Sequence, residues 1–318
     1  MYRKKTIAIV IPAYNEAKLI KPTLENVPKI VDMVFVVDDC SPDNQNEVIL
    51  EIAKKDKRIQ LIKHITNQGP GGSIISGYLA SSKAGIDITV VVGGDNQMDL
   101  SEVTNFLDPI IDGKADYAKG NRFLLNRLED TLQKMPRLRL IGNILITALT
   151  KIASGYYKTM DVVDGYTAIS RRAIDTINWD RAWKKYGYPM DFLIRLNAYG
   201  FKIIDIPRTA IYLAGERQSQ IKGFSYFIKV SPMLLRGFFW RLRFKYIFID
   251  FHPLVFFYYL SFLLLPIGML ISFTLILNHL FFSGSFVNAT RAILASSLLI
   301  AGFQFLLFAM LFDMEEGK

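Results

Sequence analysis

The chain contains a single cysteine, Cys40, among its 318 residues. One cysteine excludes an intramolecular disulfide and any metal site built from several thiolates. Two phosphate-binding glycine patterns are also missing. The glycine segment NQGPGGSIISG (67–77) has Ile74 where G-x-G-x-x-G requires glycine, and no G-K-S or G-K-T occurs, which argues against a dinucleotide-binding domain and a P-loop hydrolase. We expect these glycines to allow close packing of the helix that follows.

Charge is missing from two long stretches, residues 251–290 and 292–312, which contain no Asp, Glu, Lys or Arg. A membrane-spanning helix needs about 20 apolar residues, and soluble core helices are rarely that long. The sequence predicts a transmembrane hairpin whose first helix covers residues 254–277, followed by a polar turn over 278–288. Buried helices of a soluble protein are the alternative.

The basic residues around the first predicted span predict its orientation. Four Lys and Arg residues lie within 236–245, whereas the segment between the spans carries only His279 and, at its far end, Arg291. Because Lys and Arg favour the cytoplasmic side, the N-terminal two-thirds of the chain and the final DMEEGK are predicted to be cytoplasmic. The start MYRKKTIAIVIPAYNE lacks a cleavage site, and its apolar run ends at Pro12, so we expect no signal peptide.

The net charge of +9 suits a protein that lies on an anionic membrane surface or handles phosphates. Nucleic acid is the competing class of partner. In residues 223–248, Lys and Arg alternate with Phe, Tyr and Trp beside the predicted span, which favours the membrane interface over nucleic acid. We expect one or two amphipathic helices here, broken into short pieces by proline and glycine and lying in the interface. A cytosolic linker helix is the alternative.

Short apolar runs alternate with segments of helical composition over the first 112 residues. This order is typical of an α/β fold with a parallel sheet covered by helices on both faces. Ligands bind such sheets at the carboxyl ends of the strands, and each predicted strand is followed by a polar cluster: PAYNE, DDCSPD, NQGPGG and DNQMD. The predicted strands are 6–11, 33–38, 58–63 and 87–94, and the predicted helices are 15–27, 43–56, 71–84 and 101–112.

The pattern becomes looser after residue 115. We expect a short strand and a loop in 115–123 and a helix in 135–155. A strand or turn leading into a helix is expected in 163–174. A helix in 188–200, followed by a strand in 202–207, completes the predicted domain.

The turn GGDNQMD carries three side chains with oxygen atoms, Asp95, Gln97 and Asp99. Spaced two residues apart, these oxygens can converge on one hard cation. Mg²⁺ and Mn²⁺ prefer such ligands and commonly share substrate phosphates. The two preceding glycines let a bulky ligand approach the backbone. Capping of the following helix by Asp99 or Ser101 is the alternative.

The cluster DDCSPD places two carboxylates, Asp38 and Asp39, at a strand end. Such a pair can accept hydrogen bonds from the ribose hydroxyls and a base N–H of a nucleoside. A helix cap at Ser41 or Asp43 is the alternative, but a cap does not explain both Asp38 and Asp39. Further along the chain, Arg122 and Arg139 offer the paired donors that suit phosphate. Surface solvation is the alternative for each arginine.

Together these segments resemble family 2 glycosyltransferases of the GT-A fold, and more narrowly the polyprenyl-phosphate sugar transferases such as the dolichyl-phosphate mannose synthases. The motifs IVIPAYNE, VVDDCSPD, NQG, GGDNQMD, GNR and DGYTAIS occur in the family's order and spacing. The resemblance covers residues 1–222 and implies a Rossmann-like, mostly parallel GT-A domain there. With the segments predicted above, the chain divides into this domain, amphipathic juxtamembrane helices in 223–250, and two transmembrane helices with a short tail in 251–318.

The resemblance also implies an activity. A hexose would pass, with inversion, from a GDP- or UDP-linked donor to dolichyl or undecaprenyl phosphate, with Mg²⁺ or Mn²⁺ as cofactor. Asp95 takes the first position of the family's D-x-D metal motif and Gln97 the second. Asp99 stands where the family often has Gln, so the negative charge has moved two residues along the chain.

Other site residues follow from the same resemblance. Arg122 and Arg139 match arginines that bind the acceptor phosphate. Asp191 lies where related enzymes carry an acid that contacts a sugar hydroxyl or the acceptor, although a helix N-terminal acid that satisfies the dipole is an equal alternative. The residues expected to bind the nucleotide sugar are Pro12, Tyr14, Glu16, Val37, Asp39, Asp95, Asn96, Gln97 and Ser219.

Two other functions remain open. A processive polysaccharide synthase of the same fold would carry a Q-x-x-R-W motif, which the sequence lacks, and two spans are few for a polymer channel. A non-catalytic, membrane-anchored binding protein would be expected to lose the clustered acids and arginines, which this chain retains. The sequence does not identify the sugar, the lipid or the oligomeric state.

Overall fold

The structure, a computed structural model, describes residues 1–123, 137–209, 211, 223–281 and 289–317. The chain forms two compact units. The first consists of Met1–Ser154 and Lys158–Phe238, and the second of Gly155–Tyr157 and Phe239–Lys318. The division falls within one helix, α9 (Gly223–Arg243).

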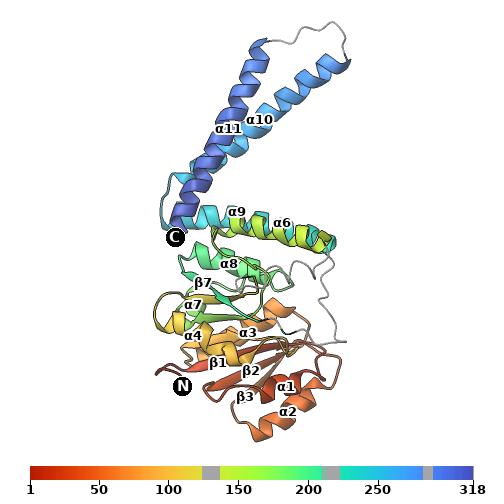
Figure 1. Cartoon of the computed structure of the whole chain (residues 1–318), viewed down its shortest axis with the longest axis vertical. Helices are drawn as coiled ribbons and strands as arrows, with labels where there is room; N and C mark the ends of the chain where they lie inside the picture. Colours follow the sequence, from red (N-terminus) through yellow and green to blue (C-terminus); the bar gives the residue numbers. More distant parts are fainter. Residues whose placement is uncertain (124–136, 210, 212–222, 282–288, 318) are drawn as a thin grey trace. The chain divides into compact units, whose positions relative to one another are not determined.

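A mixed sheet forms the centre of the first unit, with the strand order β3-β2-β1-β4-β6-β5-β7 among the described residues (Figure 1). Among the strands that the structure describes, only β6 runs antiparallel to its neighbours, β4 and β5. The mostly parallel sheet predicted from the sequence is therefore confirmed. The strands are β1 (Ile7–Ala13), β2 (Met33–Asp38), β3 (Ile59–Lys63), β4 (Ile88–Val91), β5 (Tyr117–Asn121), β6 (Thr167–Ser170) and β7 (Ile203–Pro207).

The reversed direction of β6 matters for the site. Thr167, the first residue of β6, pairs with Val91 at the end of β4 and with Lys119 in β5. Because β6 starts where its neighbours end, the segment that precedes it lies at the carboxyl edge of the parallel strands. Residues 161–166 therefore join the polar clusters that the sequence placed at this edge.

Alternation along β1 divides the core between the two faces of the sheet. Ile7, Ile9 and Ile11 belong to a buried cluster with apolar residues of α1 (Ile20–Glu25), α2 (Gln45–Lys55) and α4 (Val103–Ile111). Ala8 and Val10 face the other side, which α3 (Pro70–Lys83) covers.

Helix α3 approaches the sheet closely because Gly77 has no side chain. A Cβ on this glycine would lie 2.2 Å from Cγ1 of Val10. The close packing expected of the glycine segment is thus present. The other helices of this unit are η1 (Leu100–Glu102), α6 (Arg137–Ser154), α7 (Arg171–Thr176) and α8 (Tyr188–Ala198).

The first helix is shorter than predicted, since α1 begins at Ile20 rather than at residue 15. The backbone N–H groups of Asn15, Glu16 and Ala17 donate to side chains of the segment after β2. Asn15 also has φ +58°, outside the right-handed helical region. These contacts hold residues 14–17 as a turn at the sheet edge.

The juxtamembrane segment also differs from the prediction of short pieces. Helix α9 runs without a break from Gly223 to Arg243, through Pro232. Its Gly237 lies against α8, where a Cβ would stand 2.7 Å from Cδ1 of Ile194. Tertiary packing therefore keeps this segment helical, although its proline and glycine residues predicted interruptions.

The second unit contains two long apolar helices, α10 (Leu254–Phe281) and α11 (Ala289–Glu316). At 28 residues, each is about 42 Å long, and a bilayer core is about 30 Å thick. Most of their apolar surface is exposed in the structure, unlike that of a soluble core helix. The predicted pair of long apolar helices is confirmed, and it indicates a membrane anchor.

The start of the first span matches the prediction, but its end does not. Helix α10 continues four residues past the predicted end at 277, so residues 278–281 are helical rather than part of a turn. The rest of the predicted turn, 282–288, lies outside the described residues. A short π-helix, η2 (Phe244–Ile249), precedes α10.

A buried ion pair joins the ends of the second unit. Arg241 donates two hydrogen bonds, of 2.8 and 2.7 Å, to the carboxylate of Asp313, and both side chains are fully buried. The hydroxyls of Tyr246 and Tyr258 donate to the same carboxylate at 2.8 and 3.3 Å. A buried charge needs such partners, so this cluster fastens the end of α9 to α10 and α11.

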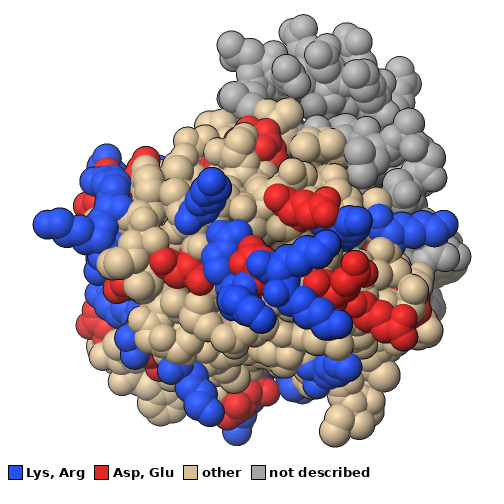
Figure 2. All heavy atoms as spheres, turned by 90° about the horizontal axis from the view of Figure 1, so that it is seen from below, with Lys and Arg blue, Asp and Glu red and all other residues tan. Residues whose placement is uncertain are grey.

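Charged side chains of both signs are scattered over the face of the molecule shown in Figure 2. Lys and Arg side chains are interspersed there with Asp and Glu. Nucleic-acid binding through charge favours a basic patch or stripe, and this face presents a mixed surface instead.

Candidate active site

The carboxyl edge of the sheet collects the predicted nucleotide-binding residues. Pro12 and Val37 are register partners near the ends of β1 and β2. Tyr14 follows β1 and is exposed. The parallel pairing of β1 with β2 and β4 brings PAYNE, DDCSPD and the DNQMD turn to one edge, as the sequence predicted.

Glu16 is the most unusual acid at this edge. Its Oε2 is buried and has no hydrogen-bond partner among the described residues. A Cβ on Gly94 would lie 2.1 Å from this oxygen, so the carboxylate rests against the turn that carries Asp95. Burial, followed by the charges of Asp95 and Asp43, raises the pKa of Glu16 to about 8. A buried oxygen without a partner calls for a hydrogen-bond donor or a cation.

Asp95 is held at the same place by its own turn. Its Oδ1 accepts a hydrogen bond of 3.2 Å from the backbone N–H of Gln97. Between them, Asn96 adopts φ +54°, the left-handed region that Asn tolerates. Burial raises the pKa of Asp95, opposed by backbone hydrogen bonds and by the charge of Arg208.

Asp99, the third predicted metal ligand, caps a helix. Its Oδ1 accepts hydrogen bonds from the backbone N–H and the hydroxyl of Ser101, at 2.9 and 2.6 Å, at the start of η1. The capping alternative is therefore seen at this residue. Because a cap uses one carboxylate oxygen, a ligand role for Asp99 stays a prediction.

Asp39 is tied into the loop before α3. Its carboxylate accepts backbone hydrogen bonds of 2.8 and 2.7 Å from Gln68 and Gly69. His64 Nδ1 lies 2.7 Å from the same carboxylate, and His64 Nε2 lies 2.8 Å from Ser76 Oγ. The structure thus gives Asp39 a role in joining two loops, and its contact with a nucleoside stays a prediction.

Arg122, at the end of β5, is held by a paired contact. Its Nε and Nη2 each donate a 2.7 Å hydrogen bond to Asp161, whose side chain is buried. Its Nε also lies 3.4 Å from Asp164 Oδ2. The guanidinium plane is therefore fixed, while about a quarter of the side chain stays exposed, 28%.

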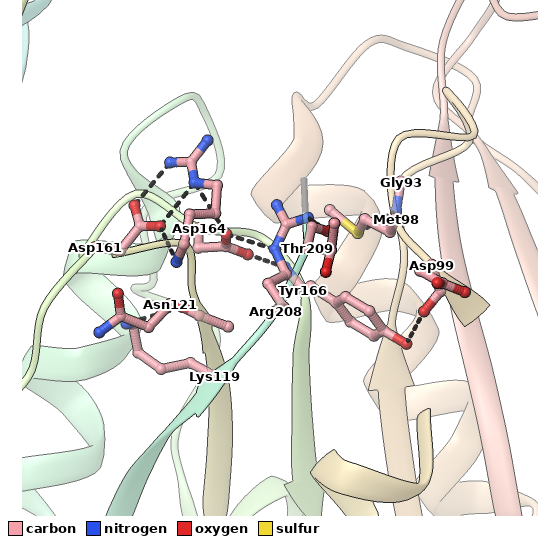
Figure 3. A network of polar contacts seen from close by, with 12 residues as sticks. Gly93, Met98, Asp99, Lys119, Asn121, Asp161, Asp164, Tyr166, Arg208 and Thr209 are labelled. Atoms are coloured by element: carbon pink, nitrogen blue, oxygen red, sulfur yellow. Dashed lines mark hydrogen bonds and ion pairs between the residues drawn. The ribbon is translucent and has the colours of Figure 1, made fainter. Parts of the chain in front are cut away.

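A second arginine, Arg208, shares Asp164. It follows β7 directly, and its Nε donates a 2.8 Å hydrogen bond to Asp164 Oδ2. Figure 3 shows Arg208 between Asp164 and the turn with Met98 and Asp99, and its charge also acts on Asp95. Two arginines and two aspartates thus extend from the end of β5 toward the acidic turn.

The sequence predictions missed Asp161, Asp164 and Arg208 as members of the site. Asp164 could have been found from the sequence DGY (164–166), just before β6, because DGY belongs to a motif that carried the resemblance. A second signal was a basic residue directly after a predicted strand. Neither signal shows that the two segments meet, because residues 161–164 and 208 lie far apart in the sequence.

The remaining predicted residues have mixed outcomes. Asp191 lies in the first turn of α8, where its Oδ2 accepts 2.7 and 2.9 Å hydrogen bonds from Arg195 Nε and the backbone N–H of Trp183. Arg139 lies in α6, but its side chain is outside what the structure describes. Ser219 lies outside the described residues.

The two halves of this edge therefore carry different groups, and the arginines of the second half are oriented by Asp161 and Asp164. Glu16 and Asp95 provide carboxylates over the β1–β4 half of the sheet, and Arg122 and Arg208 provide guanidinium groups over the β5–β7 half. Carboxylates and arginines held in fixed positions along one sheet edge are groups that can act on charged substrates. The fold and this edge define a glycosyltransferase of the GT-A type.

The chain belongs to glycosyl transferase family 2, whose family model matches residues 8–177. A UDP-N-acetylglucosamine–dolichyl-phosphate N-acetylglucosaminyltransferase of Methanococcus voltae is 30% identical over 221 residues, covering 65% of this chain and 86% of the relative. An undecaprenyl-phosphate mannosyltransferase of Micrococcus luteus is 26% identical over 208 residues, covering 64% and 83%.

Solved structures agree with the fold. Glucosyl-3-phosphoglycerate synthase from Mycobacterium tuberculosis, in complex with Mg²⁺ and uridine diphosphate, superposes with a TM-score of 0.51 at 18% identity. The match covers 75% of this chain and 79% of that one. The GT-A fold predicted from the resemblance is therefore confirmed.

Proposed function

We propose that this glycosyltransferase moves a hexose from a GDP- or UDP-linked donor to a polyprenyl phosphate, with inversion. The observation that carries the proposal is the make-up of the sheet edge, with the carboxylates of Glu16 and Asp95 on one half and two arginines, oriented by aspartates, on the other. The names of the two relatives support a polyprenyl phosphate as the acceptor. The two apolar helices support it as well, because they would keep the enzyme at the membrane where such a lipid resides.

The acidic half of the edge fits a divalent cation, Mg²⁺ or Mn²⁺. The buried Oε2 of Glu16 has no protein partner, and Asp95 and Gln97 stand on the turn against which it rests. No group of three or more His, Cys, Asp or Glu is arranged as a metal site in the described part of the chain. We infer that Asp95 and Gln97, beside the buried oxygen of Glu16, would hold such a cation together with the donor phosphates, and that it would supply charge stabilisation for the leaving diphosphate.

The chain's own residues then face one main difficulty, which is bringing two anions together. A lipid phosphate is already anionic at neutral pH, so it needs little help from a general base. Arg122, oriented by Asp161, and Arg139 would hold the acceptor phosphate and offset its repulsion by the donor. Because Asp161 fixes the guanidinium plane before substrate arrives, little reorganisation remains for binding.

A transfer assay tests the function. The full-length protein in detergent would be incubated with Mn²⁺, a polyprenyl phosphate and radiolabelled UDP-N-acetylglucosamine, UDP-glucose or GDP-mannose. The expected result is a labelled lipid in the organic phase, from which mild acid releases a single kind of monosaccharide. Labelled polymer in the aqueous phase would instead favour a processive synthase. No product with dolichyl or undecaprenyl phosphate and any donor would overturn the proposal.

Arg122→Ala and Arg139→Ala should impair use of the lipid. Losing a hydrogen bond to a charged group costs about 1.5–3 kcal/mol, or roughly ten- to hundredfold in kcat/KM for polyprenyl phosphate. Binding of the nucleotide sugar, measured without lipid, should change little. Kinetics at varied lipid concentration, together with isothermal titration of the donor, would measure both effects.

Arg172→Ala provides the matched control, because Arg172 also pairs with an aspartate, Asp116, at 2.6 Å. Arg122→Ala also removes the guanidinium that pairs with the buried carboxylate of Asp161. Arg122→Lys, which retains the positive charge, should therefore be tested beside Arg122→Ala. Equal losses in donor binding and lipid use would place these arginines on the donor side and contradict the assignment.

The catalytic domain is proposed to be cytoplasmic. A cysteine replacing Ser285, between the two spans, should react with an impermeant maleimide added outside intact cells, whereas one replacing Glu315 should not. The native Cys40 is exposed and must first be replaced by serine. The opposite labelling pattern would reverse the orientation.

A further inference from the structure

A buried lysine lies in the middle of β5, close to the arginine half of the site. The side chain of Lys119 is 2% exposed, and its Nζ lies 3.2 Å from Oδ1 of Asp205, its register partner in β7. Lysine is almost never buried to this extent unless it is paired. Asn121 donates a 2.8 Å hydrogen bond to the other oxygen of the same carboxylate. Figure 3 shows Lys119 and Asn121 below Asp161, the acid that orients Arg122.

This ion pair binds the backbone of Met160 from both sides. Oδ2 of Asp205 accepts the N–H of Met160 at 2.7 Å, while Nζ of Lys119 donates to the carbonyl of Met160. Oδ1 of Asp205 also accepts a 2.7 Å hydrogen bond from the hydroxyl of Thr159. Both polar backbone groups of one residue are thus bound by side chains of β5 and β7. We call Lys119, Asp205 and their bonds to residues 159–160 the backbone clamp.

The residue after the clamp, Asp161, has a backbone conformation that needs support. Its φ is +47°, in the left-handed region that residues other than glycine visit rarely. Such conformations persist where the surrounding structure determines them more than once, and they cluster at functional sites. The carboxylate of Asp161 accepts the backbone N–H of Arg122 at 3.1 Å, in addition to the two bonds from the guanidinium. The contacts therefore run without a gap from the clamp through Met160 and Asp161 to Arg122.

We propose that Lys119 and Asp205 are positioning residues for the acceptor phosphate and act through Asp161. By binding both backbone groups of Met160, the clamp holds Asp161 in the conformation that directs its carboxylate to Arg122. The inference deepens the proposed function and rests on it, since it takes Arg122 as a ligand of the lipid phosphate. A preset guanidinium plane lowers the cost of ordering this side chain when the lipid binds. Loss of the clamp should therefore weaken lipid binding and leave donor binding unchanged.

Asp205→Asn tests the clamp with little change in side-chain volume. The amide nitrogen cannot accept a hydrogen bond, so one half of the clamp loses its acceptor. In the full-length protein in detergent, KM for polyprenyl phosphate should rise about three- to tenfold, as expected for one weakened hydrogen bond. Turnover at saturating lipid, and the dissociation constant for the nucleotide sugar without lipid, should stay within about twofold of wild type. An unchanged KM in a folded variant would overturn the proposal.

Asp116→Asn is the matched control. The side chain of Asp116 is as exposed as that of Asp205, at 13%, and it also accepts from a basic side chain, Arg172, and from a backbone N–H, that of Lys202. It lies just before β5, at the opposite end of the strand from the site, so lipid use should not change. Equal effects of Asp205→Asn and Asp116→Asn on KM would overturn the proposal.

Thr159→Val is a milder variant that keeps the test decisive if Asp205→Asn folds poorly. It removes one hydrogen bond to the clamp and keeps the shape of the side chain. KM for polyprenyl phosphate should rise about two- to threefold, with donor binding unchanged. A folded Thr159→Val variant with wild-type KM would contradict the assignment of the clamp.

A double-mutant cycle with Arg122→Ala separates positioning from general stability. If the clamp acts through Arg122, Asp205→Asn should lower kcat/KM for the lipid by less than about twofold once the arginine is absent. Damage to the fold would instead lower activity by the same factor in both backgrounds, and it would weaken donor binding as well. Independent effects of the two substitutions would therefore overturn the proposal.

Amide hydrogen exchange separates this proposal from the proposed function, because it needs neither substrate nor activity. Since the N–H of Arg122 donates to Asp161, Asp205→Asn should speed exchange of this amide, and Asp116→Asn should not. A wild-type protein that transfers sugar to no polyprenyl phosphate would remove the proposed acceptor, while faster exchange at Arg122 would keep the clamp as the device that positions this arginine. Unchanged exchange at Arg122 would overturn the clamp, even in a protein that uses the lipid.

Discussion

Asp95→Ala is expected to abolish sugar transfer while the protein stays folded. The substitution removes a carboxylate from the acidic half of the site and leaves the apolar core unchanged. A lost metal ligand should cost several kcal/mol of transition-state stabilisation, a decrease of more than about a thousandfold in turnover. Gln97→Ala should be milder, because a neutral amide contributes less than a carboxylate. Steady-state rates and Mn²⁺ titrations of both variants would measure the difference.

Thermal unfolding provides the check on folding. The pKa of Asp95 is raised mainly by burial, so its carboxylate is not a stabilising group, and Asp95→Ala should melt no lower than wild type. Glu51→Ala, at an exposed acid of α2, is the matched control and should retain full activity. Two results together would contradict the metal assignment. They are normal sugar transfer by Asp95→Ala, and wild-type activity that EDTA does not reduce.

Asp313→Ala should destabilise the second unit more than any surface change. It would leave the guanidinium of Arg241 fully buried without its carboxylate, together with the hydroxyls of Tyr157, Tyr246 and Tyr258 that donate to the same group. Breaking a buried ion pair on one side costs about 3–5 kcal/mol. Thermal unfolding in detergent, followed by the loss of helical circular dichroism, should show a clearly lower transition.

The double replacement Arg241→Met with Asp313→Leu separates charge from packing. Because no charge is then left buried, most of the lost stability should return. Glu316→Ala serves as the control, because Glu316 is exposed and its ion pair with His252 is long, at 3.9 Å. A double variant as unstable as Asp313→Ala would show that packing, rather than an unpaired charge, accounts for the loss.

Local sequence pattern predicted much of the first unit. The apolar runs ending at Pro12, Asp38 and Lys63 became parallel strands, because β-branched residues with turn signals behind them specify strands without help from distant residues. The direction of β6 was not predictable. Its four residues carry no signal that distinguishes parallel from antiparallel pairing, which depends on β4 and β5.

The site shows the same contrast: local sequence predicted individual residues, whereas their contacts depend on segments far away in the chain. The motif around Glu16 predicted a pocket residue, but its unpartnered oxygen results from the approach of Gly94, 78 positions further along the chain. Asp99 had two interpretations from the sequence, and a local contact with Ser101 supports the cap. The link between Arg122 and Arg208 through Asp164 joins three segments, so no single window of sequence contains it.

The ion pair between Arg241 and Asp313 also constrains how many times the intervening chain crosses a bilayer. The two residues are 72 positions apart, and both apolar helices begin between them. Since their side chains touch, the chain must return to the side from which it left, so the number of crossings between them is even. During synthesis Arg241 appears first and can gain its partner only after the second helix has been inserted. A chain whose second helix fails to insert would lack the Asp313 carboxylate beside Arg241, so this contact forms only in the completed hairpin.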